Sequence, residues 1–369
     1  MSIPLAREGR NTLVDALRGV CFVFMTVDHL PGNLFSRFSN PSFGPFGFFS
    51  AAPGFVFLSG LVAGFVYERH RVRHGTASMV RRVLRRIRDL YVTQMILYAA
   101  VFVAVAFDLP GVARWDLDLF SIAHWKALLL GAVLLYEPGY FGILPMYCFF
   151  LALTPIVLWR LQSGNLWHVL GFSGLLWIVS GLMIRLPKSP LGIDFGGFNP
   201  LSYQILFIFG LAFGTSRLSI ARLPPPVRMC LIASSAVAAA LFFTLRQQYA
   251  LGGRFNALID RRWFGVVQLG PLRLLNFAAV GVVLYWAARR VEWEDIESTA
   301  FRWLAFVGRH SLPVFAWSIL TTYTAVALFP PHPSIALRVL SPVLATASLT
   351  IPALLRAMIT RCVWASGRG

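Results

Sequence analysis

Charged residues are scarce in this sequence, and acidic residues and cysteine are scarcer still. Charged side chains make up 13% of the 369 residues, while 57% are hydrophobic. Soluble domains typically carry about 25% charged residues. With a mean hydropathy of +0.68, this scarcity argues against an ordinary soluble domain and favours a membrane protein.

Cysteine is represented by only four residues, Cys21, Cys148, Cys230 and Cys362. They show no CxxC spacing and no zinc pattern, so we interpret them as small buried side chains. The sequence therefore predicts neither a metal site nor a bound cofactor.

The sequence is dominated by long apolar runs. These runs are continuously apolar, whereas the strands of a membrane β-barrel alternate between apolar and polar residues. Many are long enough to cross about 30 Å of hydrocarbon as a helix. The sequence thus predicts one all-α, polytopic membrane domain over residues 1–369. Ten runs are candidate spans: 13–30, 46–67, 90–107, 142–159, 167–184, 200–216, 229–245, 271–288, 311–328 and 339–357.

The net charge of +18 arises from 33 Lys+Arg against 15 Asp+Glu. In a soluble protein such an excess indicates nucleic-acid binding, but here the basic residues lie between apolar runs. We therefore attribute them to membrane topology and to anionic lipid headgroups, with no nucleic-acid partner. The segment 68–89 holds eight arginines and two acids, which predicts a cytoplasmic location.

The same charge rule decides whether a shorter apolar stretch, 123–136, crosses the membrane. If it crossed the membrane, the basic residues after it would fall outside. We therefore expect a re-entrant or interfacial helix, ten spans and both termini in the cytoplasm. The segment 246–268 fits least well, because it would lie outside with four arginines and one acid. There Asp260 and the RRW sequence are expected to belong to an external lid.

Ionisable groups stand at both ends of the first run, DALRGVCFVFMTVDHL. Arg18 and His29 are eleven residues apart, which puts them on one helix face about 16 Å apart along the axis. Asp15, three residues before Arg18, is placed to pair with it. Either Asp15 and Arg18 form an interfacial ion pair, with Asp28 and His29 at the other interface, or the stripe is a polar track. In a track, Arg18 would hold an anion and His29 would act as a base oriented by Asp28 or another carboxylate.

The Arg-x10-His spacing resembles the signature of the membrane acyltransferase-3 superfamily. The whole chain resembles the OpgC family, inner-membrane proteins associated with succinylation of osmoregulated periplasmic glucans. Five blocks carry the resemblance: DALRGVCFVFMTVDHLPG (15–32), FGFFSAAPGFVFLSGLVAGFVYER (46–69), LPMYCFFLALTP (144–155), FNPLSYQILFIFGLAFG (198–214) and VGRHSLPVFAWS (307–318).

The resemblance implies a multi-pass inner-membrane O-acyltransferase. It would take an acyl group from cytoplasmic acyl-CoA and pass it to a hydroxyl of a periplasmic glucan or another envelope glycan. The resemblance also implies glucan-synthesis proteins as partners. Arg18 and Asp15 would bind the donor, and His29 with Asp28 would be catalytic. Arg309 and His310 are further donor candidates, although by local pattern they simply begin a helix.

Three more residues are expected at the acceptor or in the cavity: Tyr147, Asn199 and Gln204. Each also has a structural interpretation, as an interfacial aromatic residue or as an amide bonded to a neighbouring helix. Glycines 54, 60 and 64 are expected to permit close helix packing.

The sequence departs from the family pattern at four positions. Pro53 and Gly142 stand where acids are usual, and Gln94 and Asn276 stand where histidines are frequent. These departures put in doubt the carboxylate that orients His29 and the identity of the substrates. They leave two other functions open: a transporter or flippase that uses the Arg–His track, and a catalytically degenerate paralogue that binds glycan.

Overall fold

The computed structural model consists of helices, and no strand occurs in the part of the chain that it describes. That part comprises residues 11–32, 47–115, 117, 119, 123–137, 139–182, 197–250, 261–291, 298–330 and 333–366. Of the predicted external lid, Asp260 lies outside these ranges, whereas the RRW sequence begins a short helix over Arg261–Phe264.

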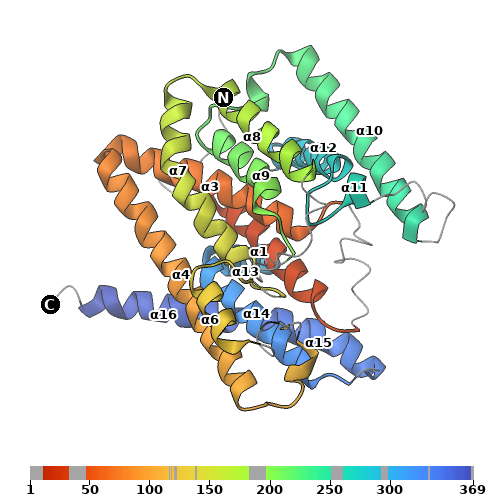
Figure 1. The fold of residues 1–369 in the computed structure, drawn as a ribbon. Coiled ribbons are helices and arrows are strands. Elements are labelled where there is room, and N and C mark those ends of the chain that lie inside the picture. The colour runs from red at the N-terminus through yellow and green to blue at the C-terminus, as the bar shows by residue number, and fades with distance from the viewer. Residues whose placement is uncertain are drawn as a thin grey trace.

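The helices form one bundle around the first of them (Figure 1). The first half of the chain contains α1 (Thr12–Asp28), α3 (Ala51–His74), α4 (Thr76–Ala106), η1 (Val112–Arg114), α6 (His124–Ala132), α7 (Ile143–Gln162) and α8 (Leu166–Leu182). The second half contains α9 (Pro200–Gly214), η3 (Ile220–Arg222), α10 (Pro225–Ala250), α11 (Arg261–Phe264), α12 (Pro271–Ala288), α13 (Thr299–Arg309), α14 (Ser311–Leu328), α15 (Ile335–Ser348) and α16 (Thr350–Ser366).

Seven segments among the described residues are long and apolar enough to cross a membrane, which identifies a multi-pass membrane protein. They are α3, α4, α7, α10 as far as Gln247, α12, α14 and the run Ile335–Ile359. Two further apolar helices, α8 and α9, are shorter. The predicted count of ten spans and the predicted sides of the termini stay predictions.

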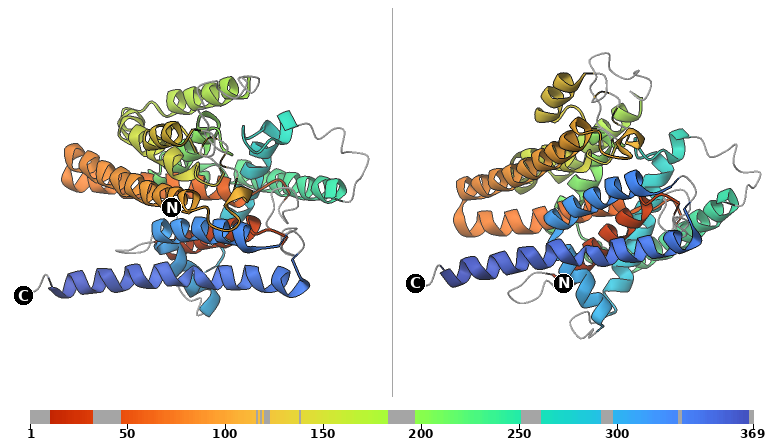
Figure 2. Two further views of the ribbon diagram at one scale, coloured as in Figure 1. Left: turned by 60° about the horizontal axis from the view of Figure 1, so that its bottom comes forward. Right: turned by 90° about the horizontal axis from the view of Figure 1, so that it is seen from below.

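Two expected elements differ in detail, while a third, the stretch expected not to cross the membrane, is too short to do so. The basic segment 68–89 is not a loop: α3 continues to His74 and α4 begins at Thr76, so that Gly75 alone, with φ +80°, makes the turn. Arginine is a good helix former, and the positive φ suits glycine. The last predicted span is divided at Leu349 into α15 and α16, which follow one another along one side of the bundle (Figure 2). The stretch 123–136 contains only the nine-residue α6, which is too short to span.

Two glycine-mediated contacts hold the centre together. A methyl group added to Gly60 would lie 2.1 Å from the Phe207 carbonyl oxygen, and one added to Gly64 would lie 2.4 Å from that of Leu211. The expectation that these glycines permit close packing is therefore confirmed for the pair α3 and α9.

Around this pair, α1 contacts α3, α13, α14 and α15, while α10 and α12 pack against each other.

Candidate functional site

The end of α13 is held against α1 by glycines on both helices. A methyl group added to Gly308 would lie 1.8 Å from the Asp15 carbonyl oxygen, and one added to Gly19 would lie 2.1 Å from that of Leu304. Only glycine leaves room for so close an approach. Because Arg309 follows Gly308 directly, this contact brings the start of α14 beside the first half of α1.

A polar cluster forms where these helices meet. Arg18 is 6% exposed, and its Nη2 donates a hydrogen bond of 2.7 Å to Ser311 Oγ. Its guanidinium carbon also lies 5.6 Å from the centre of the Phe55 ring. Arg309 Nε is 3.8 Å from Asp15 Oδ2. The structure thus brings the predicted donor residues Asp15, Arg18 and Arg309 into one place.

The cluster lines a cavity of about 3860 Å³, which we call the arginine cavity. Among the described residues, its lining includes eleven arginines but only two carboxylates, those of Asp15 and Asp89. His310 and Tyr147 also line it, as the sequence led us to expect of cavity residues. The arginines are Arg18, Arg69, Arg73, Arg82, Arg85, Arg86, Arg88, Arg222, Arg289, Arg309 and Arg356. Such a concentration of fixed positive charge attracts polyanions.

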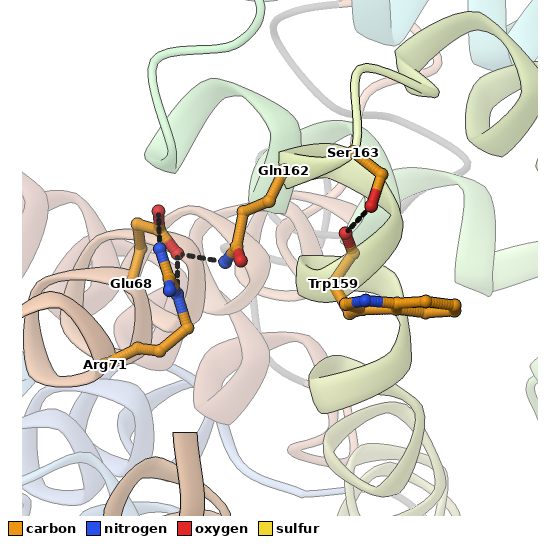
Figure 3. A network of polar contacts seen from close by, with 5 residues as sticks. All are labelled: Glu68, Arg71, Trp159, Gln162 and Ser163. Atoms are coloured by element: carbon orange, nitrogen blue, oxygen red, sulfur yellow. Dashed lines mark hydrogen bonds and ion pairs between the residues drawn. The ribbon is translucent and has the colours of Figure 1, made fainter. Parts of the chain in front are cut away.

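One arginine of the same region points away from the cavity. Arg71 donates to Glu68 from both Nε and Nη2, each at 3.1 Å. Glu68 also accepts a 2.8 Å hydrogen bond from Gln162 Nε2 at the end of α7 (Figure 3). Glu68 therefore ties α3 to α7 and stays outside the cavity lining, so it does not offset the charge there.

His29 lies just beyond the last residue of α1 and is not among the residues that line the arginine cavity. Its Nδ1 contacts the carbonyl oxygen of Met25. Since a carbonyl only accepts, Nδ1 must carry the proton, which leaves Nε2 of the neutral ring free to take one. The ring packs edge-on against Tyr140, with centroids 4.4 Å apart.

The structure does not place Asp28 as the group that orients His29, because the Met25 carbonyl holds the nitrogen that a carboxylate would need. Asp28 Oδ1 is buried and has no hydrogen-bond partner in the described part of the chain. The catalytic role expected of Asp28 stays a prediction; adjacent residues on a helix point in directions about 100° apart.

Gln204 and Asn199 do not line the arginine cavity. Gln204 accepts from Ser173 Oγ and donates to the Ser173 carbonyl oxygen, both at 2.7 Å. Asn199 caps α9 by accepting from the amide of Leu201 at 2.9 Å. Both amides are thus engaged in structural hydrogen bonds, which was one of the two interpretations that the sequence left open.

The four departures from the family pattern fall at structural positions. Gln94 is fully buried and donates to the Phe141 carbonyl oxygen at 3.4 Å. Asn276 Oδ1 accepts from the amide of Phe48 at 2.7 Å. Pro53 lies in the first turn of α3, where its missing amide hydrogen costs nothing. Gly142 is the residue before α7.

The sequence matches one family of known proteins. A family profile described as OpgC protein matches residues 10–361. The chain belongs to the OpgC family. No curated protein and no solved structure matches it. Membership in the OpgC family implies a transferase role in the succinylation of glucans.

Two features of this OpgC protein were not recognised in its sequence. Glu137, 2% exposed, belongs to the segment between α6 and α7 that also carries Tyr140. The sequence offered one signal for Glu137, which is that it is an acidic residue in an otherwise apolar stretch. Phe22, Phe55 and Phe315 pack together between Arg18 and His29, and nothing in three separate apolar runs indicates that their phenylalanines meet.

Proposed function

We propose that this OpgC protein is a membrane O-acyltransferase that moves a succinyl group from acyl-CoA to a hydroxyl of a periplasmic glucan or another envelope glycan. One observation carries the proposal: a buried arginine, Arg18, lines a cavity rich in arginine, and His29 lies eleven residues further along the same helix stripe. An anion-binding group and a base are thereby combined on one rigid element.

The arginine cavity suits the phosphate groups of a coenzyme A donor. Guanidinium groups bind phosphates in a bidentate manner, and Arg309, paired with Asp15, is fixed beside Arg18. His310 lines the same wall, with Nδ1 3.0 Å from the Phe306 carbonyl oxygen. The nucleotide would bind among the arginines and its thin acyl-pantetheine arm would extend past Arg18 toward His29.

The reaction would take place at His29. Nε2 would accept the proton of the glycan hydroxyl as that oxygen attacks the thioester carbon. The carbon–sulfur bond would break, coenzyme A would leave as the thiolate, and the proton would pass from His29 to that sulfur. An ester bond would form between the succinyl group and the glycan. Tyr140, whose ring packs in a T-shaped arrangement with that of His29, would keep the imidazole in position.

The direction of this reaction fixes the orientation of the protein. The arginine cavity would open to the cytoplasm, in line with the positive-inside rule, and His29 would lie toward the periplasm of a bacterium whose inner membrane holds the bundle. Both termini would be cytoplasmic. Enzymes that synthesise the glucan would be the functional partners.

The test is glucan-dependent release of coenzyme A from succinyl-CoA by the purified protein in lipid nanodiscs. Arg18→Gln should reduce kcat/KM by about 10- to 150-fold, because hydrogen bonds to charged groups contribute about 1.5–3 kcal/mol. Arg71→Gln is the matched control, since Arg71 points away from the cavity to Glu68, and it should leave kcat/KM unchanged.

Two outcomes would contradict the proposal. Movement of an unmodified ligand into proteoliposomes, with no thiol release from succinyl-CoA in nanodiscs, would identify a transporter. A folded protein that binds glycan but neither transfers nor transports would be a degenerate paralogue.

A further inference from the structure

The arginine cavity follows one face of α12 along the whole helix. Its lining begins with Pro271 and recurs at every third or fourth residue, through Val282 and Tyr285 to Arg289, which is the spacing of residues that share a helix face. Gly281 lines the cavity beside Val282, and a methyl group added to it would meet no atom within 4 Å. This face of α12 therefore borders open space, and we call the part of the cavity beside it the α12 groove.

The opposite wall of the α12 groove is apolar and comes from α3 and α9. Phe57 on α3 connects the walls, because its ring centroid lies 5.7 Å from that of Phe277 on α12 and 6.0 Å from that of Phe213 on α9. Leu61 and Phe65 continue the cavity lining along α3. Walls of this kind favour an apolar occupant, such as the acyl chain of a lipid.

The two long helices of the groove, α3 and α12, start beside each other. Just before α3, the Phe48 carbonyl oxygen accepts a 2.8 Å hydrogen bond from Arg273 Nη1, and the Phe48 amide donates at 2.7 Å to Asn276 Oδ1. Both helices are long and apolar enough to cross a membrane. Their ends therefore lie together on the opposite side of the bilayer.

Two arginines lie toward that opposite side at matching depths. Arg69 comes twelve residues after Phe57, Arg289 comes twelve residues after Phe277, and both arginines line the cavity. Twelve residues correspond to about 18 Å along a helix. Since one leaflet fills about half of a hydrocarbon core about 30 Å thick, the groove between these arginines and the Phe57–Phe277 contact has the length of an acyl chain in one leaflet.

Arg222 joins the two arginines from the connection between α9 and α10. A methyl group added to Gly214, the last residue of α9, would lie 2.1 Å from the Leu61 carbonyl oxygen, so this connection begins beside α3. α10, at the edge of the bundle (Figure 1), then returns along α12 to the start of that helix, where Phe242 packs against Phe48 with ring centroids 6.4 Å apart. Arg222, which lines the cavity, therefore precedes α10 on the side where α12 ends.

We propose that the α12 groove binds one anionic phospholipid. Its phosphate lies among Arg69, Arg222 and Arg289, because basic pockets between membrane helices attract anionic headgroups and guanidinium groups bind phosphate in a bidentate manner. The Arg289 guanidinium is positioned by a 3.1 Å hydrogen bond to the Tyr285 hydroxyl. One acyl chain extends along the α12 face, in the open space beside Gly281.

The test is native mass spectrometry of the detergent-purified protein, titrated with dioleoyl-phosphatidylglycerol or with dioleoyl-phosphatidylcholine. The two lipids have the same chains, but only the first carries a net negative charge. A basic residue near anionic headgroups contributes about 1 kcal/mol, which is about fivefold in affinity. With three arginines at the phosphate, phosphatidylglycerol should bind at least about tenfold more tightly than phosphatidylcholine.

Two pairs of arginines distinguish the groove from a general attraction of lipids to basic residues. Arg222→Gln combined with Arg289→Gln should weaken the binding of phosphatidylglycerol about 30-fold, because each arginine contributes about fivefold. The matched control combines Arg217→Gln with Arg290→Gln. It removes the same charge from the same two segments, but neither residue lines the cavity, so the affinity should stay unchanged.

The position of the acyl chain is tested at Gly281. Gly281→Leu places a side chain in the open groove and should weaken binding about tenfold, because it displaces about two methylene groups that contribute about 0.8 kcal/mol each. Gly174→Leu on α8 is the control, since Gly174 is also at an open position but does not line the cavity. It should leave the affinity unchanged.

Equal affinity for the two lipids would overturn the proposal, and so would an equal loss in the two double arginine variants. Unchanged binding in Gly281→Leu would show that only a phosphate is held and would overturn the assignment of a lipid. The assay contains neither an acyl donor nor a glycan, so its result is independent of the proposed function.

Discussion

The contact between Gly308 and α1 should be indispensable to the site, and Gly308→Ala tests this. The added methyl group would lie 1.8 Å from the Asp15 carbonyl oxygen, whereas real contacts of this kind are not shorter than 3.0 Å, so the helices must separate by about 1.2 Å. Overpacking of this kind costs about 1–3 kcal/mol, against a gain of up to about 1 kcal/mol in helix propensity.

The larger effect should be on activity. Separation moves Arg309 and Ser311 away from Asp15 and Arg18, and a misplacement of about 1 Å can cost about a hundredfold in rate. We therefore expect kcat/KM for succinyl transfer to fall about a hundredfold in Gly308→Ala, with only a modest fall in thermal stability. The assay is thiol release by the folded fraction after size-exclusion chromatography.

The matched control is Gly174→Ala on α8, where an added methyl group meets no atom within 4 Å. It should retain full activity and gain slightly in stability. Full activity of Gly308→Ala would refute the reasoning, because it would show that the close approach of α13 does not set the geometry of the polar cluster.

The remaining predictions concern packing and charge. Gly60→Ala forces a methyl group to within 2.1 Å of the Phe207 carbonyl oxygen and should destabilise the protein by about 1–3 kcal/mol; Gly171→Ala, at an open position, is the control in thermal unfolding. Gln204→Leu leaves the buried Ser173 hydroxyl without its acceptor and should cost about 1–3 kcal/mol in the same measurement. Affinity for adenosine 3′,5′-bisphosphate, measured by calorimetry, should fall steeply with salt, and a salt-independent affinity would contradict binding among the arginines.

The class of fold follows from composition and apolar run length, because the bilayer imposes helices of a definite length. The details that could not be foreseen have local causes. The basic segment 68–89 reads as a loop by charge, yet its arginines favour helix and Gly75 alone provides the turn. The division at Leu349 within one apolar run leaves no signal in hydropathy.

The sequence allowed predictions only for the part of the candidate site that one helix carries. Spacing along α1 predicted the shared stripe of Arg18 and His29 without the structure. Contacts between helices were not foreseen, because no sequence period relates Phe22 to Phe315 or Gly308 to Asp15. For the same reason, only the three-dimensional structure shows that the Gln204 amide is bonded to a neighbouring helix, which was one of its two interpretations.

The most direct test of the central claim is the transfer of labelled succinate from succinyl-CoA to glucan by the purified protein in nanodiscs, with His29→Ala beside the unmodified chain. We expect a succinylated glucan product that disappears in His29→Ala, while nucleotide binding in the arginine cavity is retained, because His29 does not line it. Transfer that survives in a folded His29→Ala protein would contradict the account.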